Sequence, residues 1–84
     1  DRINLKERRV MSRKSDLKKQ IAAGEKEIEE LEKKRMRSQS ALMEAHVNDV
    51  APSSADVEYF KIYTNLIKLE RENLHKLNEE LKKL

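Results

Sequence analysis

One short stretch, residues 48–54, interrupts a chain that otherwise contains almost nothing that ends a helix. It holds the only proline, Pro52, together with asparagine, aspartate and serine residues that favour turns and caps. The only glycine is Gly24. Folds built from β-strands need turn residues every ~8–12 positions. One Gly and one Pro therefore exclude barrels, sandwiches and nucleotide-binding βαβ units.

The sequence on either side of this break favours long helices. The chain has 84 residues, of which 42% are charged, and it is rich in Lys, Glu and Leu, as coiled coils are. Disorder is the competing interpretation, but the net charge is only +3 and the Leu and Ile residues are periodic. We predict an all-α fold, a single antiparallel coiled-coil hairpin with helices over about residues 2–47 and 54–84 and a loop over about 48–53. Ser53 is the expected N-cap of the second helix, with Asp56 three residues later.

Each helix has a seam of positions that alternate in steps of three and four, the spacing that two-stranded packing requires. The first seam contains several polar residues: Ile3, Glu7, Val10, Lys14, Leu17, Ile21, Gly24, Ile28, Leu31, Arg35, Ser38, Leu42 and Ala45. The second is more apolar: Phe60, Tyr63, Ile67, Glu70, Leu74, Leu77, Leu81 and Leu84. Folding about residue 50 places Leu84 opposite Leu17. Residues 1–16 would then lack a partner within this chain. Since the chain begins at Asp1 rather than Met, we expect it to be a fragment of a longer one.

Residues that could perform catalysis or bind a metal are not grouped. There is no Cys, and neither His46 nor His75 has acidic partners at metal-ligand spacing. Ser53 and Ser54 lack the His and Asp of a nucleophilic triad. We therefore expect no enzyme activity, no cofactor and no metal site. No apolar run approaches the ~18 residues of a membrane span, so we expect a cytoplasmic protein, or one held at a membrane only through its partners.

The amino-terminal end of the chain is basic. Four residues at steps of four and three share one helical face, and we call them the basic stripe: Arg2, Lys6, Arg9 and Arg13. Such a stripe can bind an acidic protein surface, nucleic acid or anionic lipid, or can simply be solvated. No aromatic side chain is interleaved for base stacking, which argues against single-stranded nucleic acid.

The start of the second helix is too apolar for one seam. Four residues form a second row beside it, which we call the flank stripe: Tyr59, Ile62, Leu66 and Leu69. A two-helix hairpin buries a narrow stripe, so this row is expected to be exposed unless the loop, through Val47, Val50 and Ala51, covers its first turn or the seam is locally wide. If exposed, it predicts a docking surface for another protein.

The segment after the break resembles the FliJ/YscO family, small coiled-coil proteins of flagellar and injectisome type III export. The resemblance covers roughly residues 35–84 and lies in Ser53-Ser54-Ala55-Asp56-Val57-Glu58-Tyr59-Phe60, followed by Ile62, Leu66, Leu69 and Asn73. It implies a long antiparallel hairpin similar to a rotary ATPase stalk, bridging an export ATPase and an export gate, with some members binding escort chaperones. It places the gate contact on Ile62, Leu66, Leu69 and Asn73.

Three functions thus remain open from the sequence. The first is a non-enzymatic adaptor or stalk of a type III (flagellar) protein export apparatus. The second is a structural coiled-coil segment of a larger scaffold, tether or motor protein. The third is a basic helical module that binds nucleic acid. Self-association into a four-helix arrangement is a further expectation, because exposed apolar surface on the first helix could be covered by a second copy.

Overall fold

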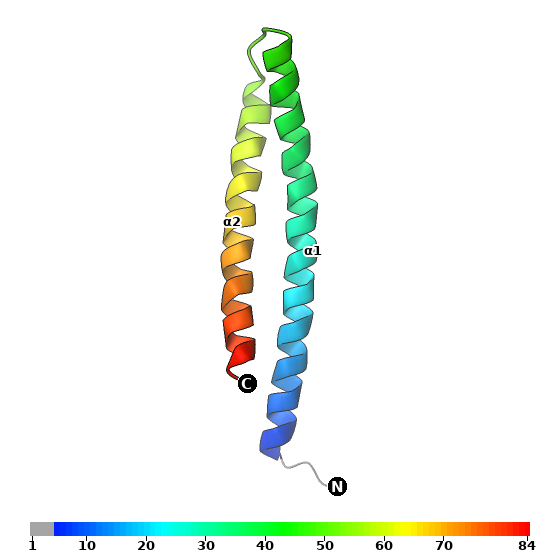
Figure 1. The fold of residues 1–84 in the computed structure, drawn as a ribbon, viewed down its shortest axis with the longest axis vertical. Coiled ribbons are helices and arrows are strands. Elements are labelled where there is room, and N and C mark those ends of the chain that lie inside the picture. Colours follow the sequence, from blue (N-terminus) through cyan, green and yellow to red (C-terminus); the bar gives the residue numbers. More distant parts are fainter. Residues whose placement is uncertain (1–4) are drawn as a thin grey trace.

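The computed structural model describes residues 5–84, and it confirms the predicted all-α hairpin (Figure 1). Helix α1 spans Leu5–Val47 and helix α2 spans Ser54–Lys82, and no strand occurs among residues 5–84. The two helices lie side by side and antiparallel, forming a rod of 70 × 16 × 16 Å. The ends agree with the sequence prediction at Val47 and Ser54 and differ by two residues at Lys82. The predicted start near residue 2 lies outside the described residues.

Helix α1 ends in a Schellman motif, in which a residue with positive φ turns the chain out of the helix. Asp49 has a φ of 54°. Its N–H donates to the His46 carbonyl at 3.1 Å, and the N–H of Val50 donates to the Ala45 carbonyl at 3.0 Å. These two bonds satisfy carbonyls that the end of a helix otherwise leaves unpaired. The turn explains why the helix stops ahead of Pro52.

Helix α2 begins with the cap that the sequence predicts. Ser53 is the N-cap, and its hydroxyl oxygen accepts a hydrogen bond from the N–H of Asp56 at 3.1 Å. The same hydroxyl donates to the Asp56 carboxylate at 2.9 Å. In a capping box the acidic side chain instead accepts from the backbone N–H of the cap residue. The shorter Asp therefore bonds the side chain of the cap residue, and its negative charge lies in the first turn, where the helix dipole favours it.

The predicted seams form the core from Leu17 onward on α1 and as far as Leu81 on α2, whereas the predicted seam residues Glu7, Val10, Lys14 and Leu84 are exposed. Leu17 and Ile67 are the most deeply buried side chains, with exposed fractions of 0% and 1%. The remaining buried positions of α1 also belong to its predicted seam, namely Ile21, Gly24, Leu31 and Ser38. On α2, the seam residues Phe60, Tyr63, Glu70, Leu74, Leu77 and Leu81 are half-buried. A pair of helices can bury only one stripe of each, which accounts for so small a core.

Gly24 contributes no apolar side chain to the predicted seam. At this position the backbone of α1 closely approaches side chains of α2. A Cβ atom placed on it would lie 2.7 Å from Cδ2 of Leu74 and 3.1 Å from Oε1 of Glu70. Leu74 therefore occupies the space that a side chain at position 24 would need. The glycine makes this contact possible at the cost of lower intrinsic helix propensity.

Helix α2 lies further along α1 than a fold about residue 50 predicts. Arg13 pairs with Glu80, so the expectation that residues 1–16 have no partner within the chain is wrong at Arg13. The reason is the connection: Ser53 has extended backbone angles, and Figure 1 shows the chain running back alongside α1 before α2 begins. An extended residue advances about 3.3 Å against 1.5 Å in a helix, so α2 starts lower on α1.

None of the helices within residues 5–84 combines the length and apolar character needed to cross a membrane.

Candidate functional site

The flank stripe lies along the outside of the seam on α2 and is exposed. Its four side chains have exposed fractions of 51% for Tyr59, 46% for Ile62, 41% for Leu66 and 60% for Leu69. Asn73, one turn after Leu69, is exposed as well and continues the row. These residues point about 100° away from the seam, which keeps them out of the contact with α1.

The connection between the helices does not shield this row. Val47 and Val50 are exposed, with fractions of 79% and 58%, and Ala51 is exposed too. The alternative in which these three residues fold over the first turn of α2 is therefore not what the structure shows. Only Tyr59 has an aromatic neighbour: its ring stacks on Tyr63, with centroids 6.1 Å apart and planes at 19°.

Basic side chains of α1 lie beside Tyr59, at the amino-terminal end of the flank stripe. Lys34 and Arg37 line a small hollow together with Ser38 of α1 and with Asp56, Tyr59 and Tyr63 of α2. At the other end of the hairpin, Arg13 pairs with Glu80, which follows Asn73 by seven residues. Both contacts lie on the same side of the seam. We call this side the stripe face.

The α1 half of the stripe face is defined by seven-residue spacing from Lys34 and Arg37. It comprises Gln20, Ala23, Glu27, Glu30, Lys34, Arg37, Ala41 and Glu44. Within residues 5–84, the side chains of Glu27, Lys34 and Arg37 form no ion pair, whereas Glu30 lies 3.8 Å from the Lys33 amine. The position of these charges beside an apolar row was not visible until the seams were paired.

The basic stripe extends the stripe face toward the amino terminus. Lys6 and Arg9 are exposed on α1, seven and four residues before Arg13, which pairs with Glu80. Arg2 lies outside the described residues. The structure thus brings the described part of the basic stripe and the flank stripe onto one side of the rod, at different heights along it.

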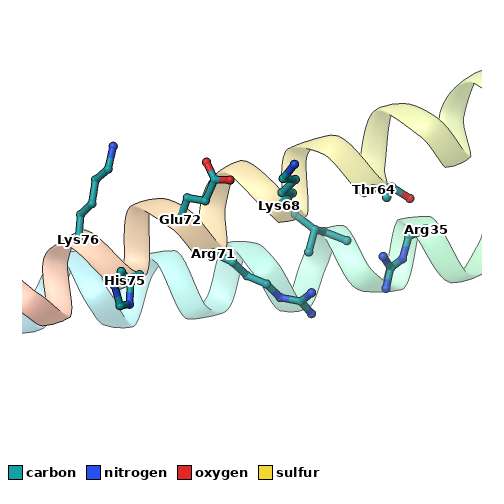
Figure 2. Close-up of a pocket in the computed structure, with 8 residues that line it drawn as sticks. Arg35, Thr64, Lys68, Arg71, Glu72, His75 and Lys76 are labelled. Atoms are coloured by element: carbon teal, nitrogen blue, oxygen red, sulfur yellow. The ribbon is translucent and has the colours of Figure 1, made fainter.

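The opposite side of the seam contains a shallow groove of about 540 Å³. Ile67 and Thr64 lie in it, and Arg35 contributes from α1 (Figure 2). Figure 2 shows Arg71 reaching across toward α1, where its Nη2 donates to Oε1 of Glu32 at 2.7 Å. Lys68, Glu72 and Lys76 point away from α1 in the same view. The Arg71 guanidinium, which spans the groove, is therefore already paired with Glu32 of the same hairpin.

No group of three or more His, Cys, Asp or Glu able to hold a metal ion occurs within residues 5–84. The two histidines, at 46 and 75, lie far apart on different helices. Near the end of α2, Nζ of Lys82 donates to Oε1 of Glu79 at 3.2 Å, and this contact lowers the pKa of the exposed Glu79 carboxyl. These polar contacts are those of a helical surface.

Comparison with known proteins assigns no function to the chain, so a functional assignment depends on the features of the molecule itself. No protein-family model, curated protein or solved structure matches the chain. The resemblance to type III export proteins stays a prediction.

Proposed function

We propose that this chain is a non-enzymatic adaptor, which docks a protein partner through the flank stripe. The observation that supports the proposal is the exposure of Ile62, Leu66 and Leu69 in one continuous row. Such flank positions usually hold Lys, Glu or Gln, as Lys68 and Glu72 do on the other side of α2. Apolar patches of a few hundred Å² on a small protein are typical of interaction sites.

The size of the row fits a reversible interaction. Burying each of the three aliphatic side chains contributes about 1–2 kcal/mol. Association opposes this gain through lost translational and rotational freedom and through ordering of side chains. The three side chains together contribute about 3–6 kcal/mol, short of the about 8 kcal/mol of a micromolar complex, so the row supports a weak, reversible contact and neighbouring residues must supply the rest.

The more specific form of the proposal is an adaptor or stalk of a type III protein export apparatus. It rests on the resemblance of residues 35–84 to the FliJ/YscO family. In that form the flank stripe and Asn73 contact an export gate, and the basic stripe near the amino terminus contacts an acidic partner such as the export ATPase.

A paired set of variants tests the role of the flank stripe. At concentrations below about 1 μM, where self-association contributes little, Leu66→Asp/Leu69→Asp should keep the helicity and melting temperature of the parent, because both residues lie outside the seam. Met36→Asp/Met43→Asp is the matched control, since it removes two exposed apolar side chains from α1. These two residues do not belong to the stripe face. A photoreactive residue at position 62, inside the stripe but unaltered in both variants, reports binding by cross-linking in cells.

The proposal expects cross-linking from position 62 to disappear in the Leu66/Leu69 variant and to persist in the Met36/Met43 variant. If the Leu66/Leu69 variant unfolds, the row belongs to the core and the proposal is wrong. Equal cross-linking in all three proteins would also overturn it, because binding would then not depend on the apolar row.

A further inference from the structure

The charges on the α1 half of the stripe face are arranged symmetrically about residue 32. Glu30 and Lys34 lie two residues on either side of it, and Glu27 and Arg37 lie five residues on either side. Each pair joins an acid to a base. Ala23 and Ala41 continue the pattern, at nine residues on either side. A second copy of α1, placed antiparallel and centred on residue 32, would therefore set each of these four charges against an opposite one. Glu44, the fifth charged residue of this half of the face, would meet Gln20, since the two lie twelve residues on either side of residue 32.

The α2 half of the face has the same kind of symmetry. Leu66 and Leu69 lie on either side of a midpoint between residues 67 and 68, and Ile62 and Asn73 lie further out at equal distances. An antiparallel second copy centred there would set Leu66 against Leu69 in two equivalent contacts. The centre of the face would then be a cluster of four leucines, with Ile62 packed against Asn73 at its rim.

The two centres of symmetry lie at the same height on the hairpin. Arg71 bonds Glu32 across the seam, and Arg35 lines a groove together with Ile67. Residue 32 of α1 is thus level with the part of α2 that holds the leucine pair. One two-fold axis can pass through both centres at once. Two independent patterns on different helices would have no reason to share a height unless the same contact used both.

We propose that the partner of the flank stripe is a second copy of this chain, which packs antiparallel against the stripe face to form a four-helix bundle. Rotation about the shared axis places α1 on α1 and α2 on α2, so every neighbouring pair of helices is antiparallel. In such an isologous contact a residue i meets j while j meets i. The inference rests on the proposed function, because it assigns an occupant to the same docking row.

The overlap is large enough for a specific contact. The two copies of α1 would overlap from about residue 17 to Val47, a length of roughly 45 Å. With a face 16 Å wide, each copy buries about 700 Å². The total is close to 1,400 Å², within the range of stable interfaces. Glu27, Lys34 and Arg37, which form no ion pair within residues 5–84, each acquire a partner in the bundle.

Charge exchange tests both the occupant and its register. Lys34→Glu/Arg37→Glu leaves only acidic side chains at positions 27, 30, 34 and 37, and Glu27→Lys/Glu30→Lys leaves only basic ones at these four positions. Sedimentation equilibrium between about 10 μM and about 1 mM should give the parent twice its mass of 9.9 kDa. Each double variant alone should weaken the dimer at least about tenfold, through like-charge repulsion. An equimolar mixture of the two variants should restore it as a heterodimer.

The matched control is Lys19→Glu/Lys26→Glu, which makes the same change of charge on the side of α1 that points away from the seam. Both lysines follow seam residues by two positions and are exposed. This variant should dimerise as the parent does. Circular dichroism of each variant checks that its helices are kept, so that a loss of mass reports the interface rather than unfolding.

The outcomes separate the occupant from the docking role itself. A strictly monomeric parent at about 1 mM overturns the second copy. If position 62 then cross-links to a different protein, the proposed function stands and only its occupant is wrong. If it cross-links to nothing, both fail. A dimer that survives Leu66→Asp/Leu69→Asp, or that the mixed charge variants do not restore, overturns the antiparallel packing on this face.

Discussion

Asp49 shows how one residue fixes the direction in which the chain leaves α1. Its φ of 54° lies in the left-handed region, which costs most L-residues free energy and which Asp and Asn tolerate better than others do. Glycine is the preferred residue at this point of a Schellman motif because it has no Cβ. Asp49 therefore adopts the geometry that the turn requires, but the turn is less stable than it would be with glycine at this position.

Replacement of Asp49 by Gly should stabilise the hairpin by about 0.5–1 kcal/mol, by relieving the left-handed strain. Thermal unfolding followed by circular dichroism measures the change. Asp49→Ala is the control, because alanine keeps a Cβ and should give no gain. A gain with alanine equal to that with glycine would mean that the carboxylate, rather than the backbone angle, is the unfavourable feature.

Gly24 predicts a coupling between two residues on different helices. Gly24→Ala alone gains helix propensity, about 1 kcal/mol, but its Cβ would meet Cδ2 of Leu74 at 2.7 Å. We expect the two effects to offset or the variant to be destabilised. In a Leu74→Ala background the obstruction is gone, so the same change should stabilise by up to about 1 kcal/mol. A double-mutant cycle with no coupling energy would contradict the close contact.

At the scale of the element, α2 has two apolar rows in different environments, one packed against α1 and one exposed. The row from Ile67 through Leu74, Leu77 and Leu81 faces α1, and the flank stripe faces outward. Both rows are equally apolar, so composition alone does not distinguish them. The two rows differ in how much free energy of unfolding is lost when one of their side chains is shortened.

Leu77→Ala should lower the free energy of unfolding by about 2 kcal/mol, the lower end for a leucine in a core, because the side chain is half-buried. Leu69→Ala, at a residue that is 60% exposed, should change it by less than about 0.5 kcal/mol at micromolar concentration. Chemical denaturation measures both. Similar losses in the two variants would show that the assignment of seam and flank is wrong.

Sequence periodicity was sufficient to predict which residues of each helix face the other. From Leu17 onward, the buried positions of α1 are those of the predicted seam, because spacing along one helix fixes its faces. Periodicity could not fix the register between helices. That depends on the extended path through Ser53 and on the close contact at Gly24, neither of which has a periodic signal. For the same reason, Lys34 and Arg37 could not be placed beside Tyr59 from spacing alone.

At the scale of the whole molecule, the hairpin is a rod in which each level contacts only the levels next to it. Toward the amino terminus of α1, Arg13 pairs with Glu80 of α2. Nearer the amino terminus than Arg13, Leu5 and Met11 are exposed. A short helical segment that buries little apolar surface is marginal in water.

Amide hydrogen exchange should therefore be fast in residues 5–12 and slow in residues 17–45. The expected contrast is at least about a hundredfold in protection, since residues 5–12 are all exposed and opening this segment uncovers little apolar surface. Mass spectrometry of peptides after exchange measures it. Uniform protection along α1 would show that something covers the amino-terminal segment in solution, and repeating the measurement on the Leu66→Asp/Leu69→Asp variant shows whether the flank stripe is involved.

The connection between the helices has a consequence for how the chain reaches its structure. Because only residues 48–53 separate α1 from α2, the first contacts between the helices close a very short loop. Closing it costs little chain entropy, and each further level of the seam adds only a small increment. Pairing of the two helices should start beside Asp49 and Ser53 and proceed along the seam toward Leu17. A chain with such local connectivity is expected to fold within microseconds to milliseconds, long before any encounter that depends on the stripe face.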